Sequence, residues 1–273
     1  SGRTTLNGEG LQHEDGHSHI QAGIIPNCVT YDPSFAFEVA VIMQDGINRM
    51  YGEKQEDVFY YMTTLNEVMD QPAMPAGAEE GIRKGLYKFE TVEGKKGKGH
   101  VQLLGSGAIM RHVREAAQIL AKDYGVTSDV FSAPSFNELA REGQDAARWN
   151  LLHPTETQRV PYVAQVLADL PTVASTDYVK AYADQIRAFV PSRHYHVLGT
   201  DGFGRSDSRA NLREHFEVDA RYVVVAALSQ LAKEGTVSNQ VVADAIAKFG
   251  LNVDRICATC ISVSSTKRRL FEL

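Results

Sequence analysis

The sequence lacks the features that mark membrane-spanning, disulfide-rich and nucleic-acid-binding proteins. No apolar run approaches the roughly 20 residues that a helix needs to cross a bilayer, so no membrane partner is expected. The only cysteines are Cys28, Cys257 and Cys260, which argues against a disulfide framework and favours a reducing, cytoplasmic location. The net charge is -6 and no basic face dominates, so no nucleic-acid partner is expected.

The chain also lacks an initiating methionine and a charged-then-apolar leader segment. It starts directly in a Gly/Thr-rich stretch, and we interpret it as a fragment of a longer protein. For that reason the missing targeting signal carries little weight. What is present is ordinary for a globular protein: 273 residues, 43% of them hydrophobic, are enough for one or two domains with a sizeable core.

One stretch near the start, Leu6 to Gln21, concentrates side chains that transfer protons or bind ligands. It holds three of the nine histidines, His13, His17 and His19, together with Glu9 and other carboxylates. Imidazoles and carboxylates carry out proton transfer near neutral pH, and the interspersed glycines let the backbone approach a ligand. A polar surface loop is the alternative. Because an apolar segment follows at once, we expect the loop to lie at the mouth of a core element.

The segment after this loop has the pattern of a β-α-β unit. Residues 24–31 predict a short buried strand, and residues 57–65 are rich in β-branched and aromatic side chains, which also indicates a strand. Between them, apolar residues at helical spacing predict a helix over residues 35–51, with Pro33 suited to its start and Gly52 to its C-cap. This order implies a parallel pair of strands.

The alternation of strands and helices continues after a Pro- and Gly-rich stretch. Residues 69–81 show no periodicity and predict an interdomain linker. Beyond it we expect strands at residues 85–92, 100–104, 128–132, 172–175 and 196–198, and helices at 108–124, 136–150, 177–189, 209–216, 220–234 and 238–249. The basic turn between the first two strands predicts a hairpin tip. The whole chain is therefore assigned to the α/β class.

Three short motifs suggest known sites but do not fit them. Gly105-Ser106-Gly107 lies between a strand and a helix, as in nucleotide-binding folds, but a third glycine is missing and tight strand-helix packing is the better interpretation. His13 to His17 matches the zinc-peptidase pattern H-E-x-x-H, but Gly16 disfavours the helix that the pattern needs. Cys257 and Cys260 form a lone C-x-x-C pair without a second pair.

Two runs of sequence closely resemble the homodimeric bacterial pyruvate dehydrogenases. They are Asn7–His19 (N-G-E-G-L-Q-H-E-D-G-H-S-H) and Leu198–Ser208 (L-G-T-D-G-F-G-R-S-D-S), and shorter matching runs occur at residues 51–56, 111–117 and 216–220. This family is the decarboxylating first component of the pyruvate dehydrogenase complex, a thiamine diphosphate enzyme related to transketolase. The resemblance covers residues 1–253.

The resemblance implies a division of the chain into four parts. Residues 1–70 would be the last part of a pyrimidine-binding (middle) domain, 71–82 a linker, 83–253 a transketolase-type C-terminal α/β domain with a mostly parallel sheet, and 254–273 a non-family tail. The C-terminal domain makes dimer contacts in this family, so a homodimer is implied. The other implied partners are pyruvate and the lipoyl-bearing dihydrolipoyl acetyltransferase component, whose lipoyl group is reductively acetylated.

At the matching positions, Glu9 and His13 are implied to be the catalytic residues. His13 would hydrogen-bond an oxygen of the cofactor-bound substrate and assist proton movement, and Glu9 would orient the substrate end. The division of this role between His13, His17 and His19 stays open. The implied cofactors are thiamine diphosphate and magnesium, but the G-D-G…N motif that holds them is absent. No cofactor-binding or metal-ligating residue is therefore expected in this chain.

We therefore expect the chain alone not to decarboxylate pyruvate. The alternative function is a non-catalytic dimerisation or assembly module, in which the C-terminal domain docks a partner. In either case the absence of neighbouring strands would leave an exposed sheet edge at Val58–Leu65, which is an aggregation risk.

Overall fold

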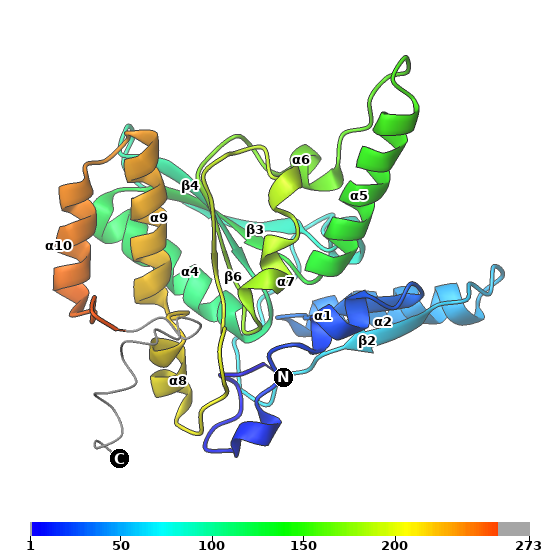
Figure 1. Ribbon diagram of the computed structural model, residues 1–273, viewed down its shortest axis with the longest axis horizontal. Coiled ribbons are helices and arrows are strands. Elements are labelled where there is room, and N and C mark those ends of the chain that lie inside the picture. The colour runs from blue at the N-terminus through cyan, green and yellow to red at the C-terminus, as the bar shows by residue number, and fades with distance from the viewer. Residues whose placement is uncertain (1, 256–273) are drawn as a thin grey trace, which may run out of the picture.

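The computed structural model describes residues 2–255, which form a small two-stranded sheet and a larger five-stranded sheet with helices around them (Figure 1). Cys257, Cys260 and almost all of the tail at 254–273 lie outside the described residues. The longest described helix has 17 residues, and none of the described helices is long and apolar enough to cross a membrane.

The N-terminal part of the chain builds the expected β-α-β unit. Strands β1 (Cys28–Tyr31) and β2 (Phe59–Met62) pair in parallel, and helix α2 (Ala36–Tyr51) connects them. The Glu38 carboxylate is fully buried at the start of α2, where it accepts hydrogen bonds from the backbone N–H groups of Ser34 and Phe35. The helix thus begins where its first free N–H groups find an acceptor.

Short helices occupy stretches that were expected to be loop or linker. They are η1 (Leu11–His13), α1 (Ser18–Gly23) and α3 (Glu79–Lys84). Asp15 holds the first turn of α1 by accepting hydrogen bonds from the N–H groups of His17 and Ser18, both at 2.9 Å. Helices of one or two turns contain too few residues to show an apolar period, which is why the sequence pattern missed them.

The larger sheet has the strand order β3-β5-β4-β6-β7. Its strands are β3 (Tyr87–Val92), β4 (His100–Gly105), β5 (Thr127–Ser132), β6 (Thr172–Ser175) and β7 (Tyr195–Leu198). All pairs are parallel except β3 with β5. The expected hairpin between β3 and β4 is wrong, because β5 lies between them. The nearly all-buried β4 takes the centre of the sheet, whereas β3, with one polar face, takes an edge.

Helices cover both faces of the larger sheet (Figure 1). One layer contains η2 (Gly107–Ile109), α4 (Met110–Ile119), the π-helical turn η3 (Leu120–Tyr124), α9 (Ala220–Glu234) and α10 (Asn239–Phe249). The other contains α5 (Phe136–Leu152), α6 (Tyr162–Val166), α7 (Lys180–Asp184) and η4 (Arg187–Phe189). The short α8 (Arg209–His215) precedes α9 and begins at the Ser208 cap, as expected. Two buried hydrophobic clusters therefore sandwich the sheet.

The two-stranded sheet with α2, which we call the small unit, packs against the larger sheet and its helices, which we call the second unit. The contact is made by the edge of β1 that faces away from β2. Arg141 of α5 donates hydrogen bonds to the backbone carbonyls of Cys28, Ile25 and Gly23 at 2.7 to 2.9 Å. Ser135 donates to the carbonyl of Thr30 at 2.6 Å. Arg141 and the N-cap residue of α5, Ser135, thus bond to the Cys28 and Thr30 carbonyls on this edge of β1, which leaves β2 as the outer strand of the small sheet.

Candidate active-site loop

The segment Gly2–Thr5, which we call the stem of the loop, lies against Asp177 in the connection between β6 and α7. Asp177 is fully buried, and its carboxylate accepts hydrogen bonds from the N–H of Thr4 at 3.0 Å and from the hydroxyls of Thr4 and Thr5 at 2.6 and 2.7 Å. Burial raises the pKa of Asp177, and the threonine hydrogen bonds oppose that rise. A Cβ on Gly2 would lie 2.6 Å from Asp177, so the contact leaves no room for a larger residue.

The other end of the loop is fixed by Glu14. This carboxylate is buried and accepts a hydrogen bond from the backbone N–H of Arg205, in the turn that follows β7. Burial raises the pKa of Glu14, and the Arg205 hydrogen bond opposes that rise. Between the two ends, Gly8 donates its N–H to the carbonyl of Asp207 at 2.9 Å. The two runs that carried the family resemblance, one near the start of the chain and one near residue 200, therefore lie against each other.

Glu9 and His13 project from the part of the loop between these fixed ends, and both side chains are exposed. His13 is the last residue of the single turn η1, and Glu9 lies just before that turn. The structure therefore places the two predicted site residues on one exposed segment, with buried carboxylates fixing the chain before and after it.

The three histidines of the loop have three different environments. His19 is fully buried, stacks on the Tyr182 ring at 4.7 Å and meets the Tyr178 ring edge-on at 4.6 Å. Burial lowers its pKa to about 3, so it is neutral at physiological pH. His17 is exposed and its Nε2 lies 3.4 Å from a guanidinium nitrogen of Arg3. Only His13 and His17 of the three are open to a surface ligand.

The zinc-peptidase interpretation is excluded by the backbone. His13 ends η1 and His17 precedes α1, so no helix carries both histidines on one face. Across residues 2–255, no group of three or more His, Cys, Asp or Glu side chains is placed to hold a metal ion.

A buried polar network lies behind the loop at the C-terminal ends of β1, β2 and β4. Thr63 donates a hydrogen bond to Asp32 at 2.7 Å and lies 3.2 Å from Nε2 of His19, and Ser106 donates to Asp32 at 2.9 Å. Since Thr63 uses its hydrogen toward Asp32, Nε2 of His19 must be the donor to Thr63. Burial raises the pKa of Asp32 to about 7. The network joins the small unit to the larger sheet.

The Gly105-Ser106-Gly107 turn serves this packing, as expected. A Cβ on Gly105 would lie 3.0 Å from Met110 in α4, and one on Gly107 would lie 2.5 Å from the Asp32 carboxylate. Gly107 also has a φ of +49°, in the region that favours glycine. Both glycines thus permit close approach of neighbouring elements.

A cluster of arginines around Glu67 was missed by the sequence interpretation. Arg213 pairs with the Glu67 carboxylate at 2.5 and 3.1 Å, Arg111 also bonds to it, and Arg209 lies 3.9 Å away. Burial alone would raise the pKa of Glu67, but the hydrogen bond and charge of Arg213, with the charges of Arg111 and Arg209, lower it overall. Glu67 stands in a stretch without periodicity, so no sequence pattern pointed to it.

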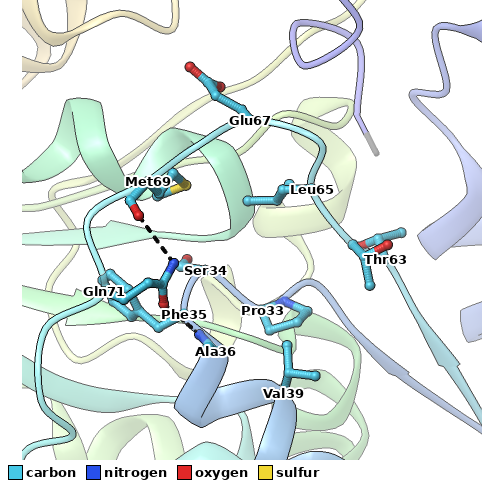
Figure 2. A pocket seen from close by; sticks show the side chains of 11 residues that line it. Pro33, Ser34, Phe35, Ala36, Val39, Thr63, Leu65, Glu67, Met69 and Gln71 are labelled. Carbon is cyan, nitrogen blue, oxygen red and sulfur yellow. Dashed lines mark hydrogen bonds between the residues drawn. The ribbon is translucent and has the colours of Figure 1, made fainter.

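Figure 2 shows a pocket at the start of α2, beneath the segment that follows β2. The amide of Gln71 closes the first turn of α2, because it accepts a hydrogen bond from the N–H of Ala36 at 2.8 Å and donates to the carbonyl of Met69 at 3.4 Å (Figure 2). Neither Glu9 nor His13 lines this pocket. The pocket is therefore not the site that the loop would serve.

Two family models match the chain. The pyruvate dehydrogenase E1 component middle domain matches residues 1–72, and the transketolase-like C-terminal domain matches residues 85–219. The loop at Leu6–Gln21 lies in the first match, and Asp177 and Arg205, which hold it, lie in the second.

Curated relatives are similar over most of the chain. The pyruvate dehydrogenase E1 component of Haemophilus influenzae is 98% identical over 256 residues, and that of Escherichia coli strain K12 is 72% identical over the same length. Each match covers 94% of this chain. The chain spans 29% of the length of these relatives.

Solved structures show the same fold at low identity. Transketolase from Pichia stipitis in complex with sedoheptulose-7-phosphate matches 86% of this chain and 29% of its own, with a TM-score of 0.60 and 16% identity. Transketolase from Leishmania mexicana matches 85% of this chain and 29% of its own, with a TM-score of 0.55 and 18% identity. These matches confirm the transketolase-like α/β fold with a mostly parallel sheet.

Proposed function

Because the chain belongs to the pyruvate dehydrogenase E1 component family, we propose that it is part of a thiamine-diphosphate-dependent pyruvate dehydrogenase. The full-length protein would decarboxylate pyruvate and reductively acetylate the lipoyl group of the dihydrolipoyl acetyltransferase component. The observation that carries this proposal is the exposed turn with Glu9 and His13, held at both ends by buried carboxylates. Such a turn suits one wall of an active site.

In this proposal His13 donates a hydrogen bond to an oxygen of the bound substrate and takes part in proton movement. An imidazole suits this task because it changes charge near neutral pH and reaches substrate from an exposed turn. Glu9, on the same turn, orients the far end of the substrate. His19 takes no part, because its ring is enclosed by tyrosines.

The described residues do not fit the diphosphate group or its magnesium ion. They contain no three-residue group of metal-ligating side chains, and the sequence has no G-D-G…N motif. We therefore assign thiamine diphosphate, the electron sink that makes the decarboxylation feasible, and magnesium to the rest of the full-length protein.

The division of the chain and its partners belong to the same proposal. We assign residues 1–70 to a middle domain, 71–82 to a linker, and 83–253 to the C-terminal domain, with 254–273 as a tail outside the family. The range assigned to the linker includes part of α3, and Ile82 of that helix is fully buried. The last residues of the linker range are therefore part of the folded core. A homodimer in the cytoplasm, acting on pyruvate, is the expected assembly.

The experiment compares the 273-residue chain alone with the chain co-expressed with the missing N-terminal portion of the enzyme. We expect no pyruvate- and thiamine-dependent decarboxylation from the chain alone and restored activity on co-expression. In the restored enzyme, His13→Gln should lower kcat about 100-fold or more, the usual contribution of a positioned acid or base. His153→Gln, at the end of α5, is the matched control and should retain activity.

Two results would overturn the proposal. Activity from the chain alone would show that it holds the cofactor without the missing portion. Co-expression that changes nothing would favour the non-catalytic assembly module instead.

A further inference from the structure

The stem of the active-site loop is held by a carboxylate that belongs to a different unit. Asp177 lies 1% exposed in the connection after β6, and it receives three hydrogen bonds from Thr4 and Thr5. Its backbone carbonyl accepts two more, from the N–H of Arg3 at 3.1 Å and from the hydroxyl of Thr200 at 2.9 Å. Both the side chain and the main chain of one residue therefore hold the stem.

This contact is more directional than packing alone requires. A buried carboxylate loses its hydration and is tolerated only where hydrogen bonds replace it, so a pair of apolar residues would fill the same space without that penalty. The three hydrogen bonds to the carboxylate instead fix the position and direction of the backbone at Thr4 and Thr5. Glu9 follows Thr5 by four residues, so an error at the stem would be carried into the exposed turn.

Residues that follow β7 make further contacts with the first part of the loop. Arg209 donates to the carbonyl of Thr5 at 2.7 Å and, through its backbone N–H, to Asn7 at 3.1 Å. Glu14 is held by the backbone of Arg205. Residues that follow β6 and β7 thus fix the segment from Gly2 to Glu14, whereas His19, further along, contacts Thr63 after β2.

We propose that Asp177 is a positioning residue, which fixes Glu9 and His13 through its bonds to Thr4 and Thr5. This inference rests on the proposed function for the catalytic consequence, but not for the structural one. Asp177 touches no substrate in this scheme. It acts through the stem, and the larger sheet domain would thereby build part of an active site to which it adds no reacting group.

The first test measures loop order in the 273-residue chain itself. Thr5→Val removes one hydroxyl donor to Asp177 at nearly constant volume, and Thr5→Ser keeps that donor. We expect the backbone order parameters of residues 8–13 to fall in Thr5→Val from about 0.85, typical of rigid backbone, toward about 0.6, and to be restored in Thr5→Ser. Asp177→Asn should act in the same direction.

The matched control is Glu38→Gln. Glu38 is equally buried and also accepts hydrogen bonds from two hydroxyls, those of Tyr87 at 2.7 Å and Ser132 at 2.5 Å, but it lies at α2 and touches no part of the loop. It should leave the order of residues 8–13 unchanged. Unchanged order in both Thr5→Val and Asp177→Asn would overturn the proposal, as would an equal loss in Glu38→Gln.

The second test measures kinetics in the enzyme restored by co-expression. Thr5→Val should lower kcat about 10- to 100-fold with little change in the KM for pyruvate, because misplacement of a catalytic turn acts on the reacting geometry. Thr5→Ser should restore kcat. If loop order is lost but kcat is unchanged, the positioning role stands and the roles proposed for Glu9 and His13 fail. If kcat falls while loop order is kept, the positioning role fails.

Discussion

His19 occupies a site unlike that of either neighbouring histidine. Its ring lies between Tyr178 and Tyr182, and its Nε2 donates to Thr63, whereas its Nδ1 has no hydrogen-bond partner among the described residues. A charged imidazole would lose its hydration there without a compensating carboxylate contact. Burial therefore lowers the pKa of His19 to about 3, well below its ordinary value of 6.5.

This depressed pKa predicts a specific dependence of stability on pH. As the pH falls below about 6.5, a proton binds His19 in the unfolded chain but not in the folded one, so this contribution to stability is lost progressively toward pH 3. His19→Gln removes the titration and keeps a donor for Thr63. As the pH falls from 7 to 5, the unaltered chain should lose about 2 kcal/mol of unfolding free energy through His19, and the variant should not show this loss. Urea unfolding at pH 7, 6 and 5 measures this difference.

Asp32, in the same hydrogen-bond network, should change stability with pH in the opposite direction and so serves as a control. Burial raises its pKa to about 7, so the stability from its protonated form is present at low pH and is lost as the pH rises from about 4 to 7. Asp32→Asn should therefore gain stability relative to the unaltered chain as the pH rises. Parallel pH profiles for the unaltered chain and His19→Gln would contradict the buried, neutral state of His19.

At the scale of single residues, sequence could mark the residues of the candidate loop but not whether each of them is buried or exposed. Glu9, His13, His17 and His19 share a composition typical of an active site, and spacing alone gave no reason to separate them. The separation comes from Tyr178 and Tyr182, which lie about 160 residues away in sequence and reach His19 only once β6 and α7 have packed. Burial by distant residues is a property of the fold.

Among the elements, Gly85 and Gly235 offer a matched pair of helix ends. Each follows a helix, α3 or α9, and each adopts a left-handed backbone, with φ of +95° and +93°. A Cβ on Gly85 would lie 2.5 Å from the carbonyl oxygen of Ser135, whereas one on Gly235 would meet nothing within 4 Å. Both positions require a left-handed backbone. They differ only in whether a neighbouring atom lies where a Cβ would be placed.

We therefore expect alanine at these two positions to act unequally. Gly235→Ala should lower the free energy of unfolding by about 1 kcal/mol, the conformational penalty alone. Gly85→Ala should lower it by about 1–3 kcal/mol more, because Ser135 and the start of α5 must shift. Urea unfolding of both variants at one pH gives the comparison. Equal losses would mean that the Ser135 contact yields without strain.

The length of an element decided how well sequence predicted it. The 15 residues of α9 and the 16 of α2 carry several turns of apolar period, and their predicted bounds agree with the structure within one residue. The six-residue α1 and α3 and the five-residue α6 carry no such signal. The wrong hairpin between β3 and β4 has a different cause: nothing local to either strand reveals that β5 inserts between them.

For the molecule as a whole, the fold class was predictable and the construction of the site was not. Alternating strand and helix patterns identify a parallel α/β fold because each pattern is local. The anchors of the loop, Asp177 and Arg205, and the Glu67 partner Arg213 are each more than 140 residues from their partners in the chain. Only the packing of the two units brings them together, and no local pattern predicts such contacts.

The outer side of the small unit combines an unpaired edge of β2 with exposed apolar side chains. In the described residues β2 pairs only with β1, and Phe59 on β2 is 45% exposed, while Met43 and Ile47 on α2 are 52% and 54% exposed. Ile42, Met50 and Met62 line an adjoining apolar hollow. A strand edge beside an apolar face is a template for association, as the sequence had indicated for residues 58–65.

We therefore predict that the chain self-associates through this face and that charge placed there suppresses it. The double variant Ile47→Lys with Phe59→Lys should lose the species larger than the expected homodimer that the unaltered chain forms at the same concentrations, because each lysine opposes both burial and strand pairing. Leu151→Lys is the control, because Leu151 is 77% exposed and is the last residue but one of α5, and its substitution should leave association unchanged. Sedimentation velocity over a range of concentrations measures all three chains. If the double variant and the unaltered chain associate equally, the contact lies elsewhere, and the open edge of β2 is protected by its own geometry.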